Sequence, residues 1–195
     1  MSLGIVFITG QSNPKSCSLS PLQVSFAQPL VRAGGKLHKT NFPYDKQMEA
    51  FSPVNIIKAS YHNYGAFRSS KRACFAERYS GYVDALFVEY SQVLFLAGSC
   101  GLELLNNLSF SKDLQSRMSV LAYGPVTRKP RCASAVQFPV TIVKGRYDLI
   151  SRLSHHKADY IVGCGHLSYL ANSAFQAFAL AHVEALLRDM KKGHA

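Results

Sequence analysis

The sequence predicts a three-layer α/β fold, in which a mostly parallel central sheet carries helices on both faces. Short apolar runs rich in β-branched residues recur along the 195-residue chain, and several of them end at a glycine. Segments with apolar residues at helical spacing alternate with these runs. Because strands that are apolar on both sides must be buried on both sides, helices have to cover both faces of the sheet.

The first elements follow from local patterns. Residues 4–8 form an apolar run that ends in Thr-Gly, which is typical of a buried strand. Ser20 followed by Pro21 is typical of a helix start, because the hydroxyl caps free N–H groups and proline suits the first helical position. Gly34 is expected to end this helix, and a second strand is expected at residues 36–40.

In the rest of the chain, the sequence pattern assigns some segments clearly and others not at all. Residues 45–68 show no pattern that assigns an element, whereas residues 71–90 have apolar side chains at helical spacing. The last segment is an amphipathic helix with basic residues in its final turn. The further predicted elements are strands at 93–97, 118–123, 140–144 and 159–162, and the closing helix at 172–192.

Length and composition favour one domain over residues 1–195, with no separate lid domain, since 48% of the residues are hydrophobic and the chain is short for two cores. No run of about 18 apolar residues could span a membrane. The N-terminal stretch MSLGIVFITGQSN lacks the features of a signal peptide, so we expect a cytoplasmic protein. Five cysteines without CxxC spacing argue against a disulfide framework and a metal site.

The chain is strongly basic. Lys and Arg total 22 against 11 Asp and Glu, so the formal net charge is +11 at pH 7. This charge attracts anions, but the basic residues are scattered and carry no signature of a nucleic-acid-binding motif. Nucleic acid is therefore not the expected partner, and the sequence leaves the oligomeric state open.

Three loops carry residues suited to nucleophilic catalysis. They follow the strands at 93–97, 140–144 and 159–162, and contain Ser99 in AGSCG, Asp148 in GRYD and His166 in GCGH. In a parallel sheet, the loops at the carboxyl ends of the strands meet along one edge, where ligands bind. The pattern therefore predicts a Ser-His-Asp triad.

The surroundings of Ser99 suit a sharp turn from strand to helix. Such a turn needs small residues two before and two after the nucleophile, and Ala97 and Gly101 meet this need. Cys100 fails the same test because Leu102 stands two residues after it. Ser99 is thus the predicted nucleophile.

The other roles follow from the chemistry of acyl transfer. His166 is expected to take the proton of Ser99, and Asp148 to orient the imidazole and stabilise its charged form. The backbone N–H groups of Cys100 and Gln11 are the predicted oxyanion hole.

Four segments together resemble the α/β-hydrolase superfamily: IVFITG, AGSCG, PVTIVKGRYD and GCGHLSYL, in this order. The resemblance implies a small, lidless serine hydrolase that cleaves an ester or thioester through an acyl-enzyme and needs no cofactor. Two positions depart from the superfamily's pattern. Thr9 replaces the usual histidine before Gly10, and Ala97 replaces the usual first glycine of the nucleophile turn.

The expected substrate is a small acyl compound, and an anionic one is favoured. Only about a dozen residues separate Gly124 from Pro139, so the site is expected to be open. Gly10, Arg128 and Arg146 are the candidate substrate-binding residues, the two arginines because basic side chains cluster near the mouth.

Alternative interpretations stay open at this point. Ser99 could simply be a small residue in a turn, and Asp148 could cap the turn that follows it. The protein could also be a hydrolase-like scaffold without catalysis that binds an acidic partner, since it combines a high positive charge with the altered Thr9 loop. A nucleotide-binding sheet is disfavoured because ITGQSN lacks the GxGxxG pattern.

Overall fold

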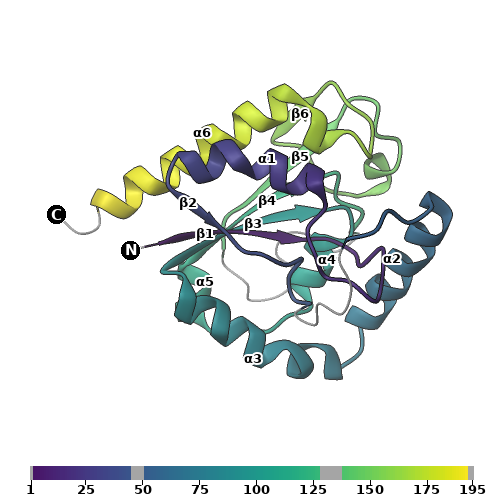
Figure 1. Ribbon diagram of the computed structural model, residues 1–195, viewed down its shortest axis with the longest axis horizontal. Coiled ribbons are helices and arrows are strands. Elements are labelled where there is room, and N and C mark those ends of the chain that lie inside the picture. The colour runs from purple at the N-terminus through teal and green to yellow at the C-terminus, as the bar shows by residue number, and fades with distance from the viewer. Residues whose placement is uncertain (1, 45–50, 128–137, 193–195) are drawn as a thin grey trace.

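The computed structural model describes residues 2–44, 51–127 and 138–192, and shows a parallel sheet between two helical layers (Figure 1). All neighbouring strands pair in parallel, in the order β2-β1-β3-β4-β5-β6. This confirms the predicted fold class. The strands are β1 Leu3–Ile8, β2 Gly35–Leu37, β3 Gln92–Gly98, β4 Met118–Tyr123, β5 Val140–Gly145 and β6 Tyr160–Val162.

Two layers of helices cover the sheet. α1 and α6 lie on one face, α3 and α5 lie on the other, and α2 and α4 lie toward the end where the central strands stop (Figure 1). The helices are α1 Pro21–Arg32, α2 Ile56–Ser70, α3 Cys74–Glu89, α4 Gly101–Asn106, α5 Lys112–Ser116 and α6 Ser173–Lys192, with short 3-10 turns η1 Ser151–Leu153 and η2 Tyr169–Ala171.

The central strands are buried on both sides, as their apolar sequences require. In β3, Phe95 and Ala97 belong to the core beneath α3, whereas Leu94 and Leu96 belong to the core beneath α1 and α6. Successive side chains of a strand point to opposite faces, so one apolar run serves both cores. The carboxyl ends of β1, β3, β4 and β5 are thereby held in register along one edge.

The predicted start of α1 is confirmed in atomic detail. The Ser20 hydroxyl accepts the N–H of Gln23 at 3.2 Å, and the Gln23 side chain accepts the N–H of Ser20 at 2.8 Å. This reciprocal arrangement is a capping box. Gly34 follows the helix with a φ of +118°, which glycine adopts without strain.

Several boundaries differ from the sequence-based expectation. β2 ends at Leu37 instead of continuing to Thr40, which forms an isolated antiparallel bridge with Ser18. The unassigned segment contains α2, and the helix expected from residue 71 begins at Cys74. In the described part of the chain, no helix is both long and apolar enough to cross a membrane.

Candidate active site

Ser99 stands on a strained turn between β3 and α4. Its φ is +53°, and it is the one non-glycine residue with positive φ among those that the structure describes. This conformation costs about 1–3 kcal/mol, so the surrounding structure must hold it. The Ser99 N–H donates to the carbonyl of Tyr123 at 3.2 Å, and the N–H of Val126 donates to the carbonyl of Ser99 at 3.1 Å. The loop after β4 therefore fixes the turn.

The turn brings α4 directly against the end of β1. A Cβ atom at Gly101 would lie 1.9 Å from the carbonyl oxygen of Ile8, so no other residue fits there. Ala97, on the strand side of the turn, is fully buried and pairs with Ile8. These contacts are the physical reason for small residues on both sides of Ser99.

The structure brings Ser99, His166 and Asp148 together. The Ser99 Oγ lies 3.2 Å from Nε2 of His166. On the other side of the ring, Nδ1 of His166 lies 2.9 Å from Oδ2 of Asp148 and 3.1 Å from Oδ1. A hydroxyl, an imidazole and a carboxylate thus form a continuous chain of hydrogen-bond distances across three separate loops.

Asp148 is completely buried and is held by several donors. The Ser151 N–H donates to its Oδ1 at 2.9 Å, and the Tyr169 hydroxyl donates to its Oδ2 at 2.7 Å. Burial alone would raise the pKa of this carboxyl, but the hydrogen bonds from Ser151, His166 and Tyr169 outweigh it and lower the pKa below 3.8. Asp148 therefore caps the following turn and faces the histidine at the same time.

Tyr169 is a member of this network that the sequence analysis missed. Its ring is buried, its hydroxyl accepts the N–H of Gly145, and it donates to Asp148. Gly124 makes room for it, because a Cβ there would lie 2.7 Å from the tyrosine ring and 3.0 Å from Oδ2 of Asp148. A buried tyrosine needs a partner for its hydroxyl. The position of Tyr169, three residues after His166, was therefore the sequence signal that could have placed it in this network.

The loop after β1 is held by Asn41, another residue without a sequence motif. The N–H of Thr9 donates to Oδ1 of Asn41 at 2.9 Å, and the Asn41 amide donates back to the carbonyl of Thr9 at 3.2 Å. The Thr9 hydroxyl also lies 3.1 Å from Oδ1 of Asn41. These contacts hold Gly10 against the turn, where a Cβ would come within 2.8 Å of the sulfur of Cys100.

The two predicted oxyanion-hole residues are placed differently. Cys100 lies between Ser99 and α4 and lines the same cavity as Ser99. Burial raises the pKa of its thiol to about 12, so the sulfur stays protonated. The Gln11 side chain turns away and donates to the carbonyls of Pro14 and Ser16, and Gln11 does not line this cavity. The role of its backbone N–H stays a prediction.

A cavity of about 760 Å³ opens beside Ser99. Gly10 and His166 line it, as do apolar side chains from several elements, and this volume suits a small organic ligand. The apolar lining residues are Phe67, Val126, Ile150 and Leu167.

Among the described residues, the cation that lines this cavity is Lys71 and not the predicted Arg146. Arg146 is exposed and does not line the cavity, and its backbone N–H donates to the carbonyl of Val162 at 2.7 Å. Arg128 lies outside the described residues. Instead, Lys71 lines the cavity, with its Nζ 4.1 Å from the ring centre of Phe67 and 3.8 Å from Oε1 of the buried Glu103.

Part of the wall comes from the segment to which the sequence analysis assigned no element. Asn63, Tyr64 and Phe67 of α2 line the cavity. In the residues that the structure describes, no cluster of three or more His, Cys, Asp or Glu side chains could hold a metal ion.

The architecture resembles several solved structures. A dienelactone hydrolase-like promiscuous phosphotriesterase from metagenomic libraries superposes with a TM-score of 0.57 at 15% identity, covering 97% of this chain and 85% of the other. The dienelactone hydrolase of Anabaena variabilis superposes with a TM-score of 0.54 at 16% identity, covering 92% of this chain and 84% of the other. A lidless α/β serine hydrolase of Xanthomonas campestris gives 0.50 at 11% identity, covering 96% and 82%.

No protein-family model and no curated protein matches the sequence. The chain nevertheless has the α/β-hydrolase fold, as its four motifs predicted. At these low identities the likeness establishes the fold alone, and the activity must follow from the side chains of the site.

Proposed function

We propose that this protein is a serine hydrolase that cleaves an ester or thioester through an acyl-enzyme, without a cofactor. One observation carries the proposal: the Oγ of Ser99, on a strained turn, lies 3.2 Å from Nε2 of His166, whose Nδ1 lies 2.9 Å from Asp148. Acyl transfer needs a nucleophile next to a base, and a carboxylate that orients the base; these three groups lie in that spatial order here.

In the proposed reaction, His166 Nε2 removes the proton of Ser99 as its Oγ bonds to the carbonyl carbon of the substrate. The resulting oxyanion accepts hydrogen bonds from the backbone N–H groups of Cys100 and Gln11. Collapse of the intermediate breaks the bond to the leaving group, which takes the proton from His166. Water then attacks the acyl-enzyme with His166 as base, and the acid product leaves with Ser99 restored.

Asp148 has an electrostatic task in this scheme. Its lowered pKa keeps it ionised at neutral pH, and its position at Nδ1 keeps the Nε2 lone pair toward Ser99. The negative charge then stabilises the imidazolium that forms when Ser99 is deprotonated. Tyr169 acts through Asp148 and is a positioning residue.

The cavity favours a small acyl group. Its apolar lining suits an acyl chain, and Lys71 at the same wall suits a substrate that carries a negative charge. We therefore propose a small, anionic ester or thioester as the substrate.

A fluorophosphonate probe tests the proposal, because it forms a covalent bond only with an activated serine. We expect the intact protein to be labelled and the Ser99→Ala variant to stay unlabelled. Ser80→Ala is the matched control, since Ser80 is exposed on α3 and far from the triad in sequence. Absence of labelling in the intact protein, or equal labelling of Ser99→Ala, would favour the alternative of a non-catalytic scaffold.

A further inference from the structure

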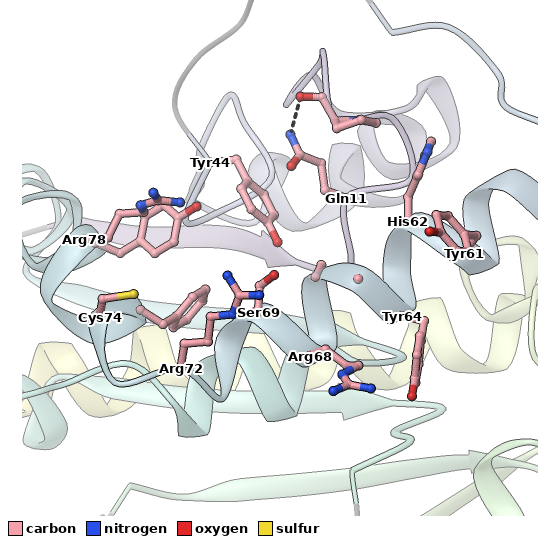
Figure 2. A pocket seen from close by; sticks show the side chains of 15 residues that line it. Gln11, Tyr44, Tyr61, His62, Tyr64, Arg68, Ser69, Arg72, Cys74 and Arg78 are labelled. Atoms are coloured by element: carbon pink, nitrogen blue, oxygen red, sulfur yellow. Dashed lines mark hydrogen bonds between the residues drawn. The ribbon is translucent and has the colours of Figure 1, made fainter.

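A second cavity lies on the other side of α2. Its volume is about 560 Å³, and it is lined by side chains of α2 and α3 and by the loop that contains Gln11 (Figure 2). Tyr64 lines both this cavity and the one beside Ser99. Of the residues that line this second cavity, the proposed reaction uses Gln11, through its backbone N–H, and none of the others.

The lining of this cavity is positively charged. Arg68, Arg72 and Arg78 line it, and no Asp or Glu among the described residues does. All three arginines are exposed, and within residues 2–44, 51–127 and 138–192 none forms an ion pair or a side-chain hydrogen bond. Their guanidinium groups are therefore available to an anion, which they can bind in a bidentate manner.

Aromatic rings form the remaining wall. The rings of Phe75 and Tyr79 pack edge to face at 4.9 Å, and those of Tyr44 and Tyr79 at 6.1 Å, so this wall is rigid. Tyr61 and Tyr64 have exposed fractions of 76% and 57%, and the ring of Tyr64 also stacks on Phe67 at 6.4 Å. Exposed rings next to arginines suit a flat, electron-rich group that stacks.

One polar atom in this cavity is unsatisfied. The hydroxyl oxygen of Tyr44 is buried and has no hydrogen-bond partner among the described residues. Figure 2 shows the ring of Tyr44 reaching toward the Arg72 side chain, with Arg78 on one side and Tyr61 and His62 at the far end. A buried hydroxyl without a partner costs about 1–3 kcal/mol, so the wall of this cavity contains a polar group that no described residue satisfies.

We infer that this second cavity binds a nucleotide, with its phosphates on Arg72 and Arg78 and its base against the exposed tyrosines. The three arginines favour a multiply charged anion, and the exposed tyrosine rings favour a flat group. A nucleotide combines these two features. The cavity volume lies within the range for small-molecule ligands of about 300–1,000 Å³. A single nucleotide therefore fits better than a polymer.

Calorimetric titration of the full chain with ADP tests this inference, with pyrophosphate and adenosine as its two fragments. We expect ADP to bind at least about tenfold more tightly than either fragment. The double variant Arg72→Gln/Arg78→Gln should weaken the binding of ADP and pyrophosphate by about tenfold or more, because each arginine supplies charge-assisted hydrogen bonds. Tyr61→Leu should weaken the binding of ADP but not that of pyrophosphate.

Two controls separate this site from general effects. Arg188→Gln changes an exposed arginine on α6 and should leave ADP binding unchanged. Ser99→Ala should also bind ADP like the intact protein, so the outcome does not depend on the proposed hydrolysis. The unfolding midpoints of the arginine variants should match that of the intact protein, since every substituted arginine is exposed.

Two outcomes would overturn the inference. One is the absence of binding heat with ADP at about 1 mM. The other is a single-stranded oligonucleotide that binds more tightly than ADP and loses affinity equally in Arg188→Gln and in the double variant. That result would indicate nonspecific attraction of a polymer to the overall charge of +11.

Discussion

The two cavities on either side of α2 are built in opposite ways. Beside Ser99, the polar groups are held in place, and Asp148 is buried with donors from Ser151, His166 and Tyr169. In the second cavity the arginines are exposed and unpaired, and their neighbours are aromatic side chains. The first arrangement holds charge in fixed positions, as a reaction requires, whereas the second leaves charge available, as binding requires.

The largest effect is expected from the histidine of the proposed triad. His166→Ala should lower kcat/KM for a short-chain nitrophenyl ester by about 10³–10⁴-fold, because Ser99 then has no base. Asp148→Asn should cause a loss of similar size by reversing the tautomer of the ring. Arg188→Gln is the control that should retain full turnover. Substantial turnover by His166→Ala would contradict the assigned roles.

The next effect concerns the backbone beneath Ser99. Gly101→Ala should lower the free energy of unfolding by about 1–3 kcal/mol or more, since the new methyl group overlaps the carbonyl of Ile8. Gly81→Ala is the matched control. Gly81 lies in α3, and a Cβ there would meet nothing within 4 Å. This change should therefore raise the free energy of unfolding by about 0.5–1 kcal/mol. Urea denaturation measures the free energy of unfolding of both variants. Equal changes in the two variants would show that residue 101 does not closely approach the carbonyl of Ile8.

A smaller effect is expected from the hydrogen bond behind Asp148. Tyr169→Phe should lower kcat by about tenfold and the free energy of unfolding at neutral pH by about 1 kcal/mol, because one donor to the carboxylate is lost. A steady-state assay and urea denaturation measure the two losses.

The pH dependence distinguishes this role from simple packing. The pKa of Asp148 is lower in the folded protein than its ordinary value of 3.8, so its stabilising contribution is complete above that value and disappears as the pH falls below it. The stability difference between the intact protein and Tyr169→Phe should therefore shrink below pH 3.8. A difference that stays constant with pH would indicate lost packing alone.

The smallest effect is expected at Cys100. Because the pKa of its thiol is about 12, iodoacetamide at about pH 8 should leave Cys100 unmodified and should not reduce esterase activity. Cys74 is exposed and serves as the positive control within the same sample. Mass spectrometry of the digested protein locates the modification. Modification of Cys100 together with loss of activity would reopen the question of which residue is the nucleophile.

The sequence predicted the sheet and the edge that carries the site, because both depend on local patterns. Apolar runs mark β1, β3, β4 and β5, and the spacing around Ser99 marks the turn after β3. The α2 segment was missed because its tyrosine-containing sequence has only a weak apolar pattern, and the helix packs against α3 and α4 instead of deep in the core. Its side chains nevertheless line both cavities.

The supporting residues were beyond the reach of sequence patterns for a different reason. Asn41 and Tyr169 lie 32 and 21 residues from the groups that they hold, and no periodicity relates such positions. The choice of Lys71 over Arg146 as the cation of the Ser99 cavity is also a long-range outcome. It depends on how α2 crosses the edge of the sheet.

By itself the sequence determined the main strands, the turn at Ser99 and the three loops that carry Ser99, Asp148 and His166, because steric and hydrogen-bonding rules act between neighbours in the chain. Only the tertiary structure decided which distant side chains complete the site and where a second, basic cavity opens. Those contacts join segments that lie far apart in the sequence and meet only in the folded chain, so no local pattern encodes them.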